Sequence, residues 1–302
     1  MNRINFNKIL LLIVTLALLS GLCACKRSSK SIARNKDGKI NVTVTIFPPY
    51  DFVRRIAEDR VNLTMLLPPG SDSHFFEPSS ADINAIANSD MVIYSGGELD
   101  AWIQPILHSR NKSIIKKLSM KDMAGTGMEY DHVWTYPYNA VLIVQAIAGQ
   151  LCEADPDNAE FFQDNADTYC AQIVMTDYAF YMLTEYAPRR IIVFADCFPF
   201  RCLSDAYGLG YYAAVPDCSA ESEADAATVD FLIDTIRAEH IPVIFHTEMN
   251  NGQLADTISE ATGAKKFLLH SCRSISKKDF DSGLGYLEIQ QRNIENLREA
   301  LH

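Results

Sequence analysis

The chain has 302 residues, 48% of them hydrophobic, and carries a formal net charge of −11. So acidic a chain is poorly suited to nucleic acid, because that binding depends on cationic side chains that meet phosphates. The length is sufficient for two α/β lobes of ordinary domain size.

The N-terminus has the pattern of an export signal. Arg3 and Lys8 precede an apolar run that is too short for a stable membrane-spanning helix but is typical of a secretory signal peptide. The run ends in "LCAC", which resembles a bacterial lipobox and implies cleavage after residues 1–24 and a lipid on Cys25. A plain secreted protein is the alternative. Residues 25–38 are rich in Ser, Lys, Arg and Asn, and we expect them to form a flexible tether.

Residues 39–155 alternate between short β-branched runs and amphipathic segments. The expected strands are 40–47, 61–67 and 91–97, and the expected helices are 50–59, 80–90, 98–109 and 139–154. Short strands separated by helices favour a parallel sheet with crossover helices. We therefore expect an N-terminal α/β lobe.

The next segment, residues 156–187, breaks this alternation. It contains no Gly and no Pro after its first residue, its apolar residues recur at helical spacing, and Pro188 follows it. A helix of this length would exceed ~40 Å, which is too long for a crossover inside a small sheet. We expect a helix that links two lobes.

Residues 188–302 return to the alternating pattern. The expected strands are 190–195, 211–215, 242–247 and 265–271, and the expected helices are 201–208, 223–240, 251–263 and 285–301. The predicted fold class is thus α/β, with two parallel-sheet lobes joined by one long helix.

Several polar side chains fall where the predicted strands end. His74 lies in "SDSHFFEPSS" after the second strand, His132 precedes the helix at 139–154, and Asp196, His246 and His270 follow strands of the second lobe. Ligands of parallel sheets bind at the carboxyl ends of strands. Imidazole is the commonest ligand for zinc and similar metals, so this set predicts a metal site.

The sequence lacks the motifs of common hydrolases, metalloproteases and nucleotide-binding proteins. The chain has no Gly-x-Ser-x-Gly, His-Glu-x-x-His, Walker A or Gly-x-Gly-x-x-Gly sequence. We therefore do not expect an enzyme, although a zinc metallohydrolase remains an alternative. Six cysteines follow Cys25 and none forms Cys-x-x-Cys, so a thiolate zinc knuckle is not expected. Export permits disulfides, but the sequence selects no pairing.

The motifs "LLPPGSDSHFFEPSSADI", "GGELDAWI", "YDHVWTYPYNAV", "AYGL" and "ADTISEATGAK" resemble the zinc/manganese solute-binding proteins of bacterial ABC importers. The resemblance runs in order from about Val42 to the C-terminus. It implies two α/β lobes, a rigid linking helix and a metal held in the cleft between the lobes. It also implies that His74, His132 and His270 are ligands, the last in place of the family's usual aspartate.

The third ligand of the family, His or Glu, has no direct counterpart. Counting forward along "IIVFAD" gives Asp196, whereas counting back from "YGL" gives Cys197, as if one residue were inserted. We prefer Asp196, and the alternative is that it caps the next helix. The predicted shell is His74, His132, Asp196 and His270. Three imidazoles favour Zn²⁺ over Mn²⁺.

The expected function follows from this resemblance. The chain would be an extracytoplasmic, lipid-anchored, monomeric protein that captures a divalent metal ion and delivers it to an ABC permease in the membrane. A surface or adhesive lipoprotein that keeps the fold without metal binding is a further alternative.

Overall fold

The computed structural model describes residues 38–72, 76–109, 116–125, 130–215, 218 and 224–302. The predicted signal peptide, Cys25 and His74 lie outside the described residues. None of the helices in the described ranges is long and apolar enough to cross a membrane.

The first lobe is built on a four-stranded parallel sheet with the order β2-β1-β3-β4. Its strands are β1 (Ile40–Val44), β2 (Val61–Met65), β3 (Met91–Tyr94) and β4 (Lys116–Ser119). The central strands β1 and β3 are rich in β-branched and apolar residues and are almost wholly buried, as a sheet covered on both faces requires. The short, lysine-containing edge strand β4 was not predicted.

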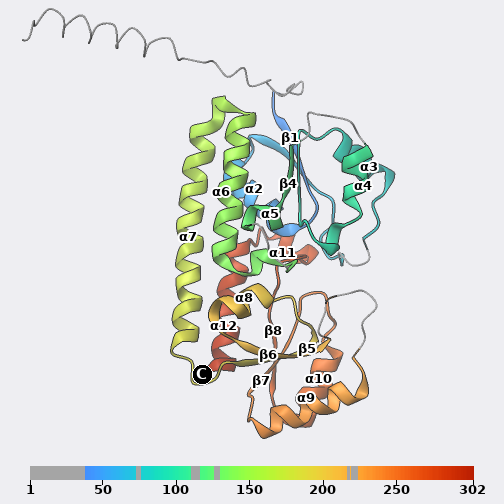
Figure 1. Cartoon of the computed structure of the whole chain (residues 1–302), viewed down its shortest axis with the longest axis vertical. Coiled ribbons are helices and arrows are strands. Elements are labelled where there is room, and N and C mark those ends of the chain that lie inside the picture. The colour runs from blue at the N-terminus through green and yellow to red at the C-terminus, as the bar shows by residue number, and fades with distance from the viewer. Residues whose placement is uncertain (1–37, 73–75, 110–115, 126–129, 216–217, 219–223) are drawn as a thin grey trace, which may run out of the picture. The chain divides into compact units, whose positions relative to one another are not determined.

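Helices connect and cover these strands (Figure 1). They are α2 (Phe47–Ala57), α3 (Ser80–Ala87), η2 (Glu98–Asp100), α4 (Ile103–Ser109), α5 (Met120–Ala124), η3 (Val133–Thr135) and α6 (Pro137–Ala154). Several begin at sequence signals of a helix start. Prolines occupy the first turns of α2 and α6, and Ser79 and Asp82 form a capping box at the start of α3.

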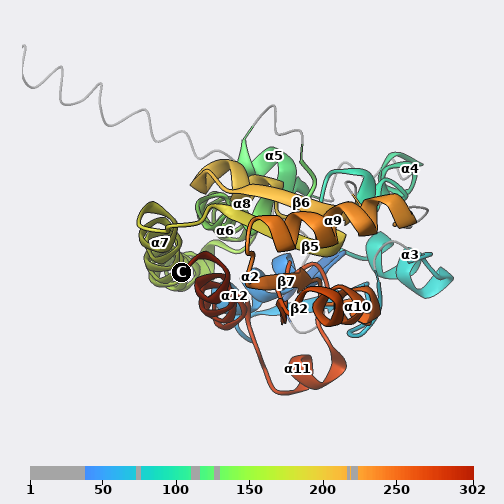
Figure 2. The ribbon, with the colours of Figure 1, turned by 90° about the horizontal axis from the view of Figure 1, so that it is seen from below.

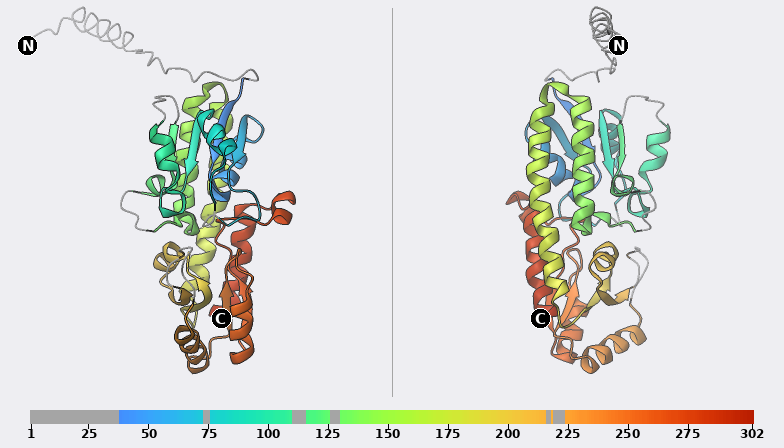
Figure 3. Two further views of the ribbon diagram at one scale, coloured as in Figure 1. Left: turned by 90° about the vertical axis from the view of Figure 1, so that its right-hand side faces the viewer. Right: turned by 60° about the vertical axis from the view of Figure 1, so that its left-hand side comes forward.

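One long helix, α7 (Ala159–Glu185), follows a short turn, η4 (Pro156–Asn158). Its 27 residues correspond to a length of about 40 Å. Phe162, Tyr169 and Ile173 pack into the core of the first lobe, whereas Phe180 and Leu183 pack into that of the second. Figure 3 shows α6 alongside its first half and α12 (Tyr286–Leu301) alongside its second half. The predicted linking helix is therefore present.

The second lobe repeats the design with a four-stranded parallel sheet of order β6-β5-β7-β8. Its strands are β5 (Ile191–Cys197), β6 (Gly210–Val215), β7 (Val243–His246) and β8 (Lys265–Leu268). The three residue steps of β5 from Phe194 to Cys197 are matched by only two steps of β6, from Ala213 to Val215. Strand β5 thus carries one extra residue as a bulge at its end, where the sequence leaves Asp196 and Cys197 as alternatives.

The remaining helices are α8 (Arg201–Tyr207), α9 (Ala226–Ala238), α10 (Gln253–Thr262), α11 (Lys277–Asp281) and α12. Figure 2 shows α9 and α10 on the same side of the second sheet. The ends of these helices carry ordinary capping residues. Asp225 accepts a hydrogen bond from Thr228 N at the start of α9, and Gly263 ends α10 with a φ of 80°.

The C-terminal segment returns to the first lobe before the last helix begins. Cys272, Ile275 and Tyr286 are buried in the same core cluster as the first sheet. The backbone N–H of Tyr286 donates to the buried carboxylate of Asp51 in α2, at 2.9 Å. This segment, like α7, therefore connects the two lobes.

Candidate metal centre

His132 stands at the start of a tight turn that leads into α6. Its carbonyl oxygen accepts hydrogen bonds from the backbone N–H of Thr135 at 3.1 Å and from the hydroxyl of Thr135 at 2.8 Å. The side chain of Asn139 holds the next peptide through Val133 O, at 3.0 Å. His132 is 8% exposed, and its ring lies 5.3 Å from the ring of Trp134, centroid to centroid. The local sequence thus fixes the position of a buried imidazole.

Asp196 lies in the bulged end of β5 and is 7% exposed. Its Oδ2 accepts hydrogen bonds from the backbone N–H of Thr247, at 2.7 Å, and from the hydroxyl of Thr247, at 2.8 Å. Its Oδ1 is buried and has no hydrogen-bond partner among the described residues. Asp196 does not cap α8, whose N-cap is Phe200. The capping alternative is therefore wrong.

The environment of Asp196 opposes its ionisation. Burial raises the pKa of this carboxyl to about 6, and the nearby Glu248 adds to the effect, although the hydrogen bonds from Thr247 and the charge of Arg273 act in the opposite direction. A cation at the unsatisfied Oδ1 would favour the charged form.

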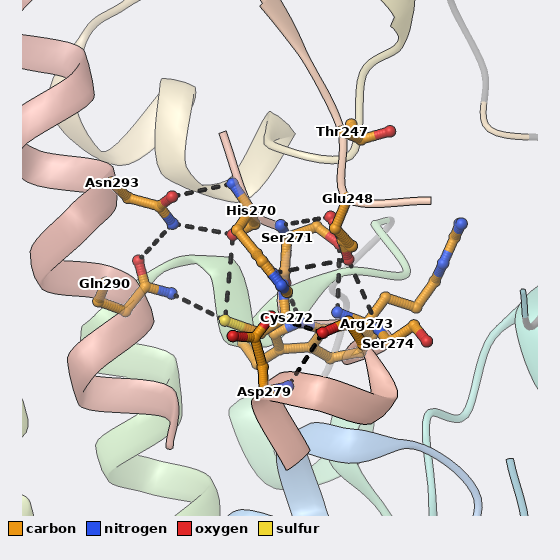
Figure 4. A network of polar contacts seen from close by, with 12 residues as sticks. Thr247, Glu248, His270, Ser271, Cys272, Arg273, Ser274, Asp279, Gln290 and Asn293 are labelled. Atoms are coloured by element: carbon orange, nitrogen blue, oxygen red, sulfur yellow. Dashed lines mark hydrogen bonds and ion pairs between the residues drawn. The ribbon is translucent and has the colours of Figure 1, made fainter. Parts of the chain in front are cut away.

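His270 follows β8 and is 8% exposed. Asn293 of α12 clamps its peptide: His270 N–H donates to Oδ1 of Asn293, and Nδ2 of Asn293 donates to His270 O, both at 2.8 Å. The ring is also fixed, because its Nδ1 accepts the backbone N–H of Cys272 at 3.0 Å. Figure 4 shows these contacts.

A chain of direct contacts joins the surroundings of these three residues across the two lobes. The indole N–H of Trp134 donates to the carbonyl oxygen of Ser271 at 2.8 Å, which brings the His-Val-Trp motif to the residue next to His270. On the other side, Glu248 follows Thr247, the partner of Asp196, and its carboxylate accepts the backbone N–H of Ser271 at 2.9 Å.

These contacts bring the neighbours of His132, Asp196 and His270 together but do not close a shell. In the described part of the chain, no group of three His, Cys, Asp or Glu side chains is placed to hold a metal ion. His74, the fourth predicted ligand, is outside the described residues.

Cys197, the other candidate for the third ligand, is bonded to Cys218 in a disulfide. Its sulfur is therefore not available as a thiolate in this structure. The following Phe198 and Phe200 are buried, and both pack against Phe194, so the segment after the bulge enters the core of the second lobe. Of the other described cysteines, Cys152, Cys170, Cys202 and Cys272 are free.

Sequence reasoning missed a group of buried polar residues behind His270. The sequence alone assigned no role to Glu248, Ser271, Arg273 or Asp72. Arg273 donates from Nη2 to Oδ1 of Asp72 at 3.1 Å, which joins the second lobe to the loop that precedes His74. Charged residues are rarely buried without a partner. This rule identifies such a group only once burial is known, and the sequence does not show which charged residues are buried.

His246, the remaining histidine at a strand end, contacts a different part of the second lobe. Its Nδ1 is 3.1 Å from Thr247 O, and its ring faces Gly252 at the start of α10. Burial lowers the pKa of this imidazole, and Lys266 adds to the effect, so the neutral form is favoured.

Two parallel-sheet lobes joined by a long helix, with buried imidazole and carboxylate groups at strand ends, define a two-lobe solute-binding protein. The family described as "Zinc-uptake complex component A periplasmic" matches residues 42–300. The chain belongs to this family.

Individual relatives agree with this assignment. The chain is 27% identical to the high-affinity zinc uptake system protein ZnuA of Bacillus subtilis, over 93% of this chain and 93% of that protein. It is 27% identical to the zinc-binding lipoprotein AdcA of Streptococcus pneumoniae, over 94% of this chain but 60% of that longer protein. The zinc-bound ZnuA-like domain of S. pneumoniae AdcA superposes with a TM-score of 0.76 at 26% identity, covering 87% of this chain and 99% of that one. The predicted fold class and family are confirmed.

Proposed function

We propose that this protein is the extracytoplasmic solute-binding component of a bacterial metal ABC importer, which captures zinc and delivers it to the membrane permease. Its family is a zinc-uptake family, and the B. subtilis and S. pneumoniae relatives are named for zinc uptake and zinc binding. Such a role is binding and release, not catalysis.

We infer that the zinc ligands are His74, His132, Asp196 and His270. The observation that carries this inference is the buried Oδ1 of Asp196, which has no hydrogen-bond partner among the described residues. A buried polar atom without a partner costs free energy, and a bound cation would remove that cost. The contacts through Trp134 and Thr247 support the gathering of the other described ligands at the same place.

The donor set suits zinc. Three imidazole nitrogens and one carboxylate oxygen match a tetrahedral zinc site, whereas manganese prefers a shell richer in oxygen. Four protein ligands would leave no open position for a substrate of hydrolysis.

A chelator competition assay tests the ligand set. In the wild-type protein we expect one zinc ion per chain, and His132→Ala, Asp196→Ala and His270→Ala should each weaken zinc binding at least tenfold, about 1.4 kcal/mol. His74→Ala should do the same. His108→Ala, which alters an exposed histidine of α4, is the control and should bind as the wild type does. A ligand variant with unchanged affinity would remove that residue from the site, and a wild type that binds no zinc would overturn the function.

We further propose that the protein is a monomer held at the membrane by a lipid on Cys25. The lipobox-like "LCAC" sequence supports Cys25 as the site of lipid attachment. Cys25→Ser should release the protein from the membrane fraction, whereas Cys23→Ser should not. Equal membrane association of Cys25→Ser and the wild type would contradict the anchor.

A further inference from the structure

A buried carboxylate lies directly behind His270. Glu248 follows β7, and its side chain is 6% exposed. Its Oε2 accepts the backbone N–H of Ser271 at 2.9 Å, and its Oε1 accepts the Ser271 hydroxyl at 2.6 Å. The same Oε1 lies 3.8 Å from Nδ1 of His270 (Figure 4). Glu248 therefore fixes Ser271, the residue after His270, and lies close to Nδ1 of the His270 ring.

Both carboxylate oxygens of Glu248 accept hydrogen bonds from Ser271, as an ionised carboxylate does. A buried anion of this kind is a strong hydrogen-bond acceptor.

The ring of His270 is held in one orientation by a bond that matters for metal binding. Its Nδ1 accepts the backbone N–H of Cys272 at 3.0 Å, and a neutral imidazole that accepts at Nδ1 carries its proton on Nε2. Nε2 can then coordinate a metal ion only after its proton has left. A metal-bound histidine ordinarily donates its other N–H to a carboxylate or a carbonyl oxygen.

We propose that Glu248 is a positioning residue of the metal centre: it fixes the turn that carries His270 and accepts the Nδ1–H of that ring when Nε2 binds the metal ion. The inference rests on the proposed function, in which His270 is a ligand. The proton leaves Nε2 to solvent and a proton from solvent binds Nδ1, so the ring stays neutral and no co-reactant is needed. Reaching hydrogen-bond distance requires Nδ1 and Oε1 to approach by about 1 Å, and the hydrogen bond from the backbone N–H of Cys272 to Nδ1 is broken in exchange.

A purely structural role is the competing explanation, because Glu248 also satisfies the buried N–H and hydroxyl of Ser271. The two explanations differ in what they predict for zinc-bound His270, whose proton must lie on Nδ1 in either case. In the positioning role this Nδ1–H donates to Glu248, so Glu248→Gln should shift its ¹H resonance and weaken zinc binding. In a purely structural role, both the resonance and the zinc affinity should be those of the wild type.

The test combines zinc affinity with the histidine tautomer. Glu248→Gln keeps the length of the side chain and an oxygen acceptor for Ser271 N–H but removes the charge. Glu260→Gln, an exposed change on α10 of the same lobe, controls for the loss of one negative charge. Chelator competition with zinc should show affinity 10- to 100-fold weaker for Glu248→Gln and unchanged for Glu260→Gln. Long-range ¹H–¹⁵N spectra of the wild type should show His270 protonated on Nε2 without zinc and on Nδ1 with zinc.

The outcomes separate this inference from the proposed function. If the wild type binds no zinc, the proposed function and this inference both fail. If the wild type binds zinc but His270→Ala binds it equally well, the inference alone fails. It also fails if Glu248→Gln binds zinc as tightly as the wild type, or if His270 keeps one tautomer throughout. Thermal unfolding of the metal-free variants identifies misfolding. Should Glu248→Gln misfold, the Nδ1–H of His270 in the zinc-bound wild type decides: a resonance protected from exchange with solvent supports the hydrogen bond to Glu248, and a rapidly exchanging one contradicts it.

Discussion

The indole N–H of Trp134 donates a 2.8 Å hydrogen bond to the carbonyl oxygen of Ser271, which lies 137 positions later in the chain. Both residues are buried, at 0% and 2% exposure. The bond joins the turn that carries His132 to the turn that carries His270. A single side chain thus ties the turn before α6 to the turn after β8.

Trp134→Phe should therefore destabilise the protein. It removes the donor while it keeps an aromatic ring, so the buried oxygen of Ser271 loses its partner, and we expect a loss of about 1–3 kcal/mol in the free energy of unfolding. Chemical denaturation measures this. Trp102→Phe, at a half-buried tryptophan that packs on Phe76, is the matched control and should cost less. Equal losses for the two variants would show that the hydrogen bond contributes nothing.

The disulfide between Cys197 and Cys218 allows a second prediction. It closes a loop over a sequence separation of 21, for which the expected contribution to stability is about 3 kcal/mol. Cys197→Ser, Cys218→Ser and the double variant should lose the same stability, because each breaks the same bond. All three should bind zinc with wild-type affinity, since Asp196 is the proposed ligand.

Cys152→Ser, at a free and half-buried cysteine, controls for the loss of a thiol. If Cys197→Ser abolishes zinc binding while Cys218→Ser preserves it, Cys197 is a ligand and the choice of Asp196 is wrong.

Much of this fold could be predicted from the sequence because its elements carry strong local signals. The β-branched run of β1 and the absence of Gly and Pro in α7 each specify one structure. The edge strand β4 could not be found in this way. It has four residues, begins with Lys116 and Lys117, and is stabilised by pairing with β3, a contact between distant parts of the chain.

The residues of the candidate site could be proposed from the sequence, but their contacts could not. Ligands of parallel sheets gather at strand ends, and this rule singled out Asp196 and His270 as candidates. The bulge of β5 depends on how the strand pairs with β6, so the sequence left Asp196 and Cys197 as alternatives. The role of Glu248 depends on burial and on Ser271, 23 positions away, and no local pattern encodes it.

Asp100 gives the stability a pH dependence. Its carboxylate is 2% exposed and accepts hydrogen bonds from Ser95 N, Gly96 N and the hydroxyl of Thr45. Burial raises the pKa of Asp100 to about 6 even though these bonds lower it. The ordinary pKa is about 3.9, so the folded state binds the proton more tightly than the unfolded state. The stabilisation is complete below about pH 4 and is lost as the pH rises to about 6.

Asp100→Asn should remove this contribution. In metal-free protein, the free energy of unfolding of the wild type should fall more steeply between pH 4 and 6 than that of the variant, by up to about 1.4 kcal/mol per pH unit. Asp59→Asn, at a side chain that is 87% exposed, should leave the slope unchanged. Parallel curves for Asp100→Asn and the wild type would show that Asp100 is ionised with an ordinary pKa.

The ion pair between Arg273 and Asp72 should contribute more to stability than surface pairs of this protein. Their side chains are 7% and 26% exposed, and adjacent bonds from Ser274 Oγ to Ser71 O and from Gly70 N to Ile275 O, both 2.7 Å, fasten the same two segments together.

Asp72→Asn leaves the guanidinium of Arg273 buried without this carboxylate, so we expect a loss of about 1–3 kcal/mol, between the values for exposed and fully buried pairs. Asp281→Asn breaks the ion pair between Asp281 and Lys277, whose side chains are 56% and 72% exposed, respectively. It should lower the free energy of unfolding by less than about 1 kcal/mol. Urea unfolding of both variants, together with Arg273→Met and the double variant Asp72→Asn/Arg273→Met, gives the coupling energy of the pair. Additive effects of the two single changes would mean that the lobes are held together without it.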